Sequence, residues 1–206
     1  MSAAARAPFA GQGHGPCGLR FGRTLQRAGP HDRAAPRRTD ALHMEAIMSI
    51  PARLSSYLDE RGVRYEVCPH EHSHSSAETA RSAHVASHQL AKSVILEHDG
   101  GRMMAIVPAD RSVMLGELSR LVDRRDLRLA DEDAIAEMFS DCDRGAVPSL
   151  GMAWGVETIV DDELASGEVV YLEAGDHENL LRLSADQFRS LMQSARHGHF
   201  SREPIH

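Results

Sequence analysis

Residues 92–109 read KSVILEHDGGRMMAIVPA, two β-rich runs joined by an Asp-Gly-Gly turn at 99–101. A glycine-containing turn between two such runs indicates a β-hairpin. Further β-rich runs follow at 157–162, 167–175 and 179–184, with helical patterns between them. Short, mostly antiparallel-looking strands interrupted by helices predict an α+β fold. We expect a single mixed α/β domain in which a curved, barrel-like mixed sheet is surrounded by helices.

Helical stretches flank these strands. Residues 51–62 (PARLSSYLDERG) place apolar side chains on one helical face and end at Gly62, a common C-terminal stop. Capping boxes indicate the start of two later helices, at Ser75 and at Ser184. Regular βαβ alternation and a G-x-G-x-x-G motif are both absent, which argues against a doubly wound nucleotide-binding fold.

Composition divides the chain into three parts. Residues 1–47 are rich in Ala, Gly, Pro and Arg and have no sustained apolar period. We expect them to be disordered, or to be an extension upstream of a working start at Met44 or Met48. The folded domain is expected at 48–196, with a flexible tail at 197–206.

The predicted domain is strongly acidic. The whole chain has a net charge of −7, although residues 1–47 carry seven arginines against three acidic residues. An acidic body binds a phosphate backbone poorly, so any nucleic-acid partner must be recognised locally rather than in a broad basic groove. No stretch has the ~18 consecutive apolar residues of a membrane span, and an apolar secretory segment is absent. We therefore expect a cytoplasmic protein without a membrane partner.

Lys92, in the first run of the hairpin, is the only lysine among 23 basic residues. Lysine and arginine are not interchangeable where space is limited, because guanidinium is planar and wide and an ammonium is compact. Lys92 is therefore a candidate for special chemistry in a tight site. The alternative is chance in an arginine-biased sequence.

The stretch GAVPSLG at 145–151 is the second unusual feature. Two glycines bracket a proline, and the side chains between them are small or apolar. Such a loop can bring backbone N–H groups close to a ligand, and backbone donors suit a carbonyl or an oxyanion. The alternative is a connecting turn packed against the core.

Three histidines alternate in PHEHSHS, at His70, His72 and His74. In an extended conformation they would project to one side, within reach of a metal ion. No carboxylate or cysteine clearly completes the set, so a polar pocket rim or a solvated loop is the alternative that we favour. In EAGDHEN (173–179), Asp176 and His177 could orient one another at a pocket mouth or belong to a solvated turn.

The order of these features resembles the YbaK/prolyl-tRNA synthetase editing-domain family, the aminoacyl-tRNA deacylases. The resemblance covers residues 50–194. The matching stretches, in order, are YLDERGVRYEV, PHEHSHSSAETA, QLAKSVIL, MMAIVPAD, LRLADEDAIAEMF, GAVPSLG, TIVDDEL and VYLEAGDHENLLRL.

This resemblance implies a pocket where Lys92, the catalytic residue, meets the loop at 145–151. It also implies a set of substrate-binding residues in three pocket walls: His70 and His72; Gly145, Ala146, Val147, Pro148, Ser149 and Gly151; Gly175 and Asp176. The family loop commonly has two adjacent prolines, and Ser149 replaces the second. We expect Ser149 to loosen the loop and to offer a hydroxyl to the pocket.

The resemblance implies a freestanding trans-editing enzyme, which hydrolyses the ester of a mischarged tRNA carrying a small amino acid, such as Cys or Ala on proline tRNA. It implies no cofactor and no metal. The expected partners are the aminoacyl-tRNA acceptor end and an aminoacyl-tRNA synthetase, and the expected state is a monomer or weak dimer. Two alternatives are a non-catalytic binding module on the same fold and a metal-dependent hydrolase built on His70, His72 and His74.

Overall fold

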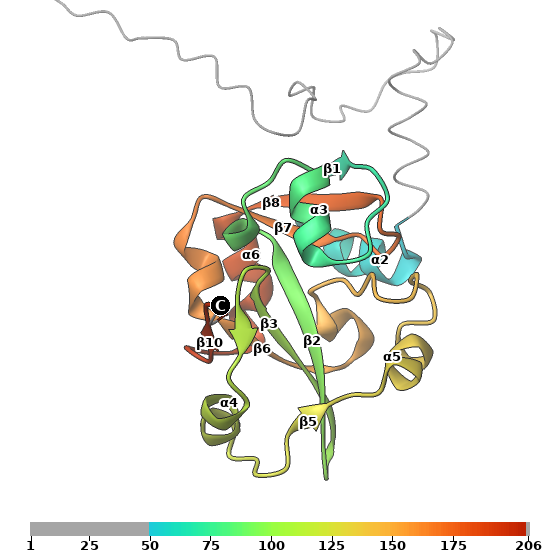
Figure 1. Cartoon of the computed structure of the whole chain (residues 1–206). Coiled ribbons are helices and arrows are strands. Elements are labelled where there is room, and N and C mark those ends of the chain that lie inside the picture. The colour runs from blue at the N-terminus through green and yellow to red at the C-terminus, as the bar shows by residue number, and fades with distance from the viewer. Residues whose placement is uncertain (1–49, 205–206) are drawn as a thin grey trace, which may run out of the picture.

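The hairpin forms the centre of the structure, a computed structural model that describes residues 50–204 (Figure 1). β2 (Ala91–His98) pairs antiparallel with β3 (Gly101–Pro108), from Ala91 opposite Pro108 to His98 opposite Gly101. The turn depends on Gly101, whose φ of 134° is a conformation that other residues rarely adopt. Residues 1–47, expected to be an extension, lie outside the described residues.

The hairpin is extended into a five-stranded sheet of order β5-β2-β3-β6-β9. β5 (Arg128–Leu129) pairs antiparallel with β2, whereas β6 (Glu157–Asp161) pairs parallel with β3 and β9 (Arg196–Gly198) pairs parallel with β6. The sheet is therefore mixed, as the sequence predicts.

A second, antiparallel sheet has the order β1-β8-β7, with β1 at Glu66–Pro69, β8 at Asn179–Ser184 and β7 at Val169–Glu173. A single bridge between Leu90 and Tyr171 joins it to the start of β2. The mixed α/β class is confirmed, but within residues 50–204 the sheets do not close into a barrel. Figure 1 shows this sheet, with α2 and α3, at one end of β2, and α4 and β5 at the other.

Five α-helices pack around the sheets in the described part of the chain: α2 (Ala52–Glu60), α3 (Ser76–Ser82), α4 (Leu115–Val122), α5 (Glu132–Met138) and α6 (Ala185–Leu191). Four 3₁₀ turns accompany them, at Ser87–Gln89, Gly151–Trp154, Asp162–Ser166 and Met192–Ser194. The predicted caps form, because the hydroxyls of Ser75 and Ser184 accept from Glu78 N and Gln187 N, each at 3.3 Å. β1 begins only at Glu66, since Val63 N still donates to Leu58 O at the end of α2.

Alternate residues of β3 enter two hydrophobic clusters on opposite faces of the sheet, because successive side chains of a strand point in opposite directions. Met104 and Ile106 pack in the cluster that includes Leu58 of α2. Met103 packs in the second cluster together with Leu118 of α4. Burial on both faces makes β3 the central strand of the fold.

Residues 196–202 take part in strand pairing in the structure, whereas the sequence predicts a flexible tail from residue 197. β9 joins the main sheet, and β10 (Ser201–Arg202) pairs with β4 (Ser112–Val113). Between them Phe200 is fully buried, and its N–H donates to the Asp161 carboxylate at 2.9 Å. Short strands of this kind are stabilised by pairing with distant residues, which the local sequence does not reveal.

Replacing Phe200 tests whether this segment belongs to the domain. We expect Phe200→Ala to lower the free energy of unfolding by ~3–5 kcal/mol, because it leaves a cavity in a closed cluster. Urea denaturation followed by circular dichroism measures the loss. The exposed neighbour Arg202→Ala serves as the control and is expected to change stability by less than ~0.5 kcal/mol. Equal stability of the two variants would contradict the assignment.

Candidate functional site

A cavity of about 130 Å³ lies where the start of β2, α3, α5, the loop at 145–151 and the turn between β7 and β8 meet. Lys92, Gly145 and Val147, which the sequence analysis singled out separately, all line it. Residues about 50 positions apart in the chain therefore reach the same site, because β2 runs past the loop. We take this cavity as the candidate functional site.

Lys92 is half-buried at the start of β2. Its Nζ donates to the carbonyl oxygens of Ala109 at 3.3 Å and Arg111 at 2.5 Å. Burial lowers the pKa of Lys92, and the negative charge of Asp110 opposes this shift. An ammonium has three N–H donors, so the two carbonyls leave one donor for a ligand.

Two residues of the loop at 145–151 present unused backbone donors. Gly145 has a φ of 92°, which a side chain would strain. Within residues 50–204 the N–H groups of Gly145 and Val147 donate to no acceptor. Backbone donors of this kind can bind a carbonyl oxygen or an oxyanion.

The other predicted residues of this loop are buried and do not line the cavity: Ala146, Pro148, Ser149 and Gly151. The Ser149 hydroxyl donates to Ala91 O at 3.1 Å and lies 2.9 Å from the Ser93 hydroxyl. It therefore ties the loop to β2 instead of facing the pocket as expected. A Cβ at Gly151 would lie 2.6 Å from Thr158 Oγ1, so this glycine permits close packing.

Gly175 and Asp176 shape the turn between β7 and β8 without lining the cavity. Gly175 has a φ of 112°, and a Cβ there would lie 2.9 Å from Pro51 Cγ. The Asp176 carboxylate accepts from Asn179 N at 2.9 Å and from Asn179 Nδ2 at 2.6 Å. These contacts place the next residue, His177, in the cavity wall. Its φ of 60° is uncommon for a residue with a side chain, and such conformations are typical of functional sites.

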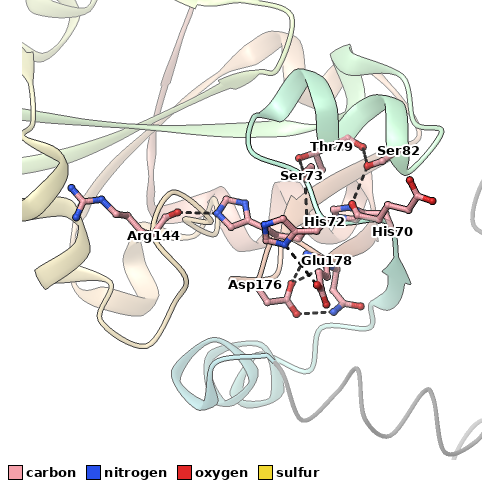
Figure 2. Close-up of polar contacts among 11 residues, drawn as sticks. His70, His72, Ser73, Thr79, Ser82, Arg144, Asp176 and Glu178 are labelled. Atoms are coloured by element: carbon pink, nitrogen blue, oxygen red, sulfur yellow. Dashed lines mark hydrogen bonds and ion pairs between the residues drawn. The ribbon is translucent and has the colours of Figure 1, made fainter.

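Figure 2 shows His70 and His72 with different polar partners, whereas the rings of His72 and His74 lie 4.9 Å apart in an edge-to-face contact. His70 Nδ1 lies 2.8 Å from Glu71 O and 3.3 Å from the Ser82 hydroxyl, and neither His70 nor His72 lines the cavity. The rings of His72 and His177 are 5.4 Å apart, and His177 Nε2 lies 2.9 Å from Arg144 O. Among residues 50–204, no three His, Cys, Asp or Glu side chains are placed to hold a metal ion.

One histidine of this loop and one residue of the helix after it do contribute to the site. His74 lines the cavity, together with Thr79 in the following helix, although the sequence analysis named neither as a substrate-binding residue. The capping box at Ser75 was the available signal, because it begins the helix that carries Thr79 into the wall. The rim of the cavity is therefore polar, as the favoured alternative for this loop supposed.

Glu173 is the main residue of the site that the sequence analysis missed. It lies at the end of β7, lines the cavity and is only 8% exposed. Its Oε1 accepts from the Thr79 hydroxyl at 3.0 Å. Burial raises the pKa of Glu173, although the Thr79 hydrogen bond and the charge of His177 act in the opposite direction. One acid at the end of the apolar run VVYLE was the available signal.

This raised pKa makes stability depend on pH. The folded protein retains a proton on Glu173 that the unfolded chain releases, so the stability contributed there is full at low pH and is lost as pH rises through the folded-state pKa. Glu173→Gln cannot ionise and keeps an acceptor for Thr79. We expect it to melt at a higher temperature than wild type at about pH 8, with the gap narrowing toward about pH 4.

Thermal unfolding of wild type, Glu173→Gln and the exposed control Glu168→Gln, at both pH values, measures the effect. The control removes an exposed carboxylate just before β7, at the end of the strand opposite Glu173. Its melting temperature should differ from that of wild type by the same amount at both pH values. A gap for Glu173→Gln that grows toward low pH would contradict the expected sign.

Comparison with known proteins places this fold and sequence in a family. A family model described as the aminoacyl-tRNA editing domain matches residues 70–191, more than half of the chain. A search of curated proteins gave no match. No helix in residues 50–204 has the length and apolar character needed to cross a bilayer.

Solved structures share the fold at low sequence identity. One is a candidate trans-editing enzyme for prolyl tRNA synthetase, with a TM-score of 0.64 and 22% identity over 73% of this chain and 95% of that one. Another is a scaffold protein from epitope grafting. It has a TM-score of 0.64 and 22% sequence identity, and the match covers 74% of this chain and 96% of that one. A third is a candidate signal transduction protein from Marinobacter aquaeolei VT8. It has a TM-score of 0.60 and 23% sequence identity, and the match covers 74% of this chain and 31% of that one. By the match of its sequence, this chain belongs to the aminoacyl-tRNA editing domain family.

Proposed function

We propose that this protein is a freestanding aminoacyl-tRNA deacylase, which hydrolyses the ester between a small amino acid and the tRNA on which it was wrongly placed. The observation that carries the proposal is the shared cavity of Lys92, Gly145 and Val147. The lining of this cavity thus includes a lysine whose ammonium has one unused donor and two loop residues whose N–H groups are unused. These are the groups that an ester hydrolysis requires, because its transition state develops negative charge on the carbonyl oxygen.

The reaction needs no nucleophilic side chain. Water adds to the ester carbonyl, the tetrahedral intermediate places its charge on the former carbonyl oxygen, and the bond to the ribose oxygen breaks to give a free amino acid and a tRNA hydroxyl. Gly145 N–H and Val147 N–H would bind the oxyanion, and Lys92 would add a compact positive charge. Cys142 is not a plausible competitor, since burial raises the pKa of its thiol to about 12 and keeps it protonated.

The size of the cavity supports a small aminoacyl group. Its volume of about 130 Å³ is well below the ~300–1,000 Å³ of pockets for drug-sized ligands. A small pocket admits small side chains and excludes larger ones by steric conflict. Because one structure of this fold is described as a candidate trans-editing enzyme for prolyl tRNA synthetase, Cys and Ala on proline tRNA are the first substrates to assay.

Recognition of the tRNA would be local. The chain carries a net charge of −7, which disfavours a long phosphate-binding surface. The acceptor end would therefore supply most contacts, or a synthetase partner would deliver the tRNA. We propose residues 50–204 as the unit that performs this function, because the C-terminal strands complete its sheet.

Lys92→Arg tests the role of the only lysine. The charge is conserved, but a guanidinium is wider than an ammonium and would not fit between Ala109 O and Arg111 O with a donor left for substrate. We expect kcat/KM for deacylation of Ala-, Cys- or Ser-charged tRNA to fall by ~10²-fold or more. Arg128→Lys, an exposed position, is the matched control and should retain full activity. Wild-type activity of Lys92→Arg would remove the lysine from the mechanism.

Gly145→Ala tests the loop amides. Its φ of 92° is unfavourable for alanine, so the substitution should tilt the peptide and misplace the N–H groups of the loop. A shift of ~1 Å in a positioning group can cost ~10²-fold in rate, and we expect a loss of that order in single-turnover deacylation. Gly116→Ala, where a Cβ meets nothing within 4 Å, is the control. Activity equal to that of the control would show that the amides are not required.

The alternative of a binding module makes a different prediction. A module on this fold would bind an aminoacyl end saturably and release it unchanged, without turnover of any charged tRNA. A Ser149 hydroxyl facing the cavity would favour such a module, but this hydroxyl donates to Ala91 O and lies 2.9 Å from the Ser93 hydroxyl. The deacylase proposal is therefore the better supported of the two.

A further inference from the structure

The carboxylate of Glu173 has no role in the chemistry proposed above, although it is 92% buried in the wall of the same cavity, with only 8% of the residue exposed. Oε1 accepts from Thr79, whereas Oε2 has no hydrogen-bond partner in the described part of the chain. The Thr79 hydroxyl lies within 3.1 Å of Ser75 O as well, and one hydroxyl has only one proton to donate. The carboxylate is thus short of donors.

No ion pair within residues 50–204 neutralises this group, and the charge of His177 offsets the effect of its burial only in part. Among residues 50–204, no Lys, Arg or His nitrogen lies within 4.0 Å of a Glu173 oxygen, and Lys92 is occupied with Ala109 O and Arg111 O. Burying a carboxylate without a partner is unfavourable, and burial accordingly raises its pKa. A positively charged group of a ligand would satisfy Oε2 and stabilise the ionised form.

The lining of the cavity therefore offers two chemically different kinds of group. Lys92, Gly145 and Val147 have unused donors, which suit a carbonyl oxygen, and Glu173 has an unsatisfied acceptor, which suits a cation. An aminoacyl ester carries both features in one small group, since a single carbon atom separates its α-ammonium from its carbonyl.

We propose that Glu173 is a specificity-determining residue that binds the α-ammonium group of the aminoacyl ester. The protein then acts on esters of amino acids with a free amino group and discriminates against acyl groups of the same size without that charge. This inference rests on the proposed function, because it names the substrate class of the same site.

Glu173→Gln is the informative variant. It keeps the shape of the side chain and an oxygen that accepts from Thr79, and it replaces the charge and the second acceptor oxygen by a neutral NH2 group. Glu168→Gln makes the same chemical change at an exposed position and is the matched control. The probes are two non-hydrolysable adenosines that carry L-alanine or L-lactate in amide linkage at the 3′ position, because lactate replaces the ammonium of alanine by a hydroxyl of similar size.

Dissociation constants from titration calorimetry give the first readout. We expect wild type and Glu168→Gln to bind the alanyl probe at least ~10-fold more tightly than the lactyl probe, since hydrogen bonds to charged groups are the stronger ones. Glu173→Gln should bind both probes equally and melt cooperatively. Equal binding of the two probes by wild type, or an unchanged preference in Glu173→Gln, would overturn the inference.

Deacylation of alanyl-tRNA and lactyl-tRNA gives the second readout and separates this inference from the proposed function. Hydrolysis of both by wild type with equal kcat/KM overturns the role of Glu173 and leaves the deacylase standing. Discrimination between the probes without hydrolysis of any charged tRNA supports the role of Glu173 and overturns the deacylase. Preferential hydrolysis of alanyl-tRNA that disappears in Glu173→Gln supports both.

Discussion

The site depends on a small hydrogen-bond network that fastens the loop at 145–151 to β2. The Ser93 hydroxyl donates to Val147 O at 3.0 Å, and the Ser149 hydroxyl donates to Ala91 O at 3.1 Å. The two hydroxyls are also 2.9 Å apart. Because these bonds use residues on both sides of Lys92, they fix the distance between its ammonium and the loop amides. A serine where the family commonly has a proline therefore holds the loop through its side chain.

Much of the fold follows from local sequence. The Asp-Gly-Gly turn, the capping serines and the apolar faces of α2 and β3 are determined by neighbours in the chain, and the structure has them where their patterns predict. The strands near the C-terminus cannot be predicted from local sequence. β9 and β10 are stabilised by pairing with β6 and β4, and no pattern within three residues reveals a distant partner.

Part of the candidate site could also be predicted from local sequence. Lys92 and the glycine–proline loop stood out by composition, and the structure places Lys92, Gly145 and Val147 in one cavity. Which member of a turn faces a cavity depends on individual φ values. Gly175 and Asp176 were expected to bind substrate and do not line the wall, whereas His177, considered only as a partner of Asp176 at a pocket mouth, does. Glu173 was missed because an acid at the end of a strand usually lies in solvent, and only packing against α3 buries it.

The contact between the two sheets has a mechanical consequence. Lys92 and Ser93 belong to the five-stranded sheet, whereas Glu173 and the turn with His177 belong to the three-stranded one, and a single backbone bridge from Leu90 to Tyr171 joins them. The cavity therefore straddles a seam that is closed by side-chain packing rather than by a ladder of hydrogen bonds. Side chains along this seam can be exchanged without breaking a strand pairing. Substitutions along this seam, even outside the cavity, are thus a route by which evolution can change the size of the ligand that the cavity admits.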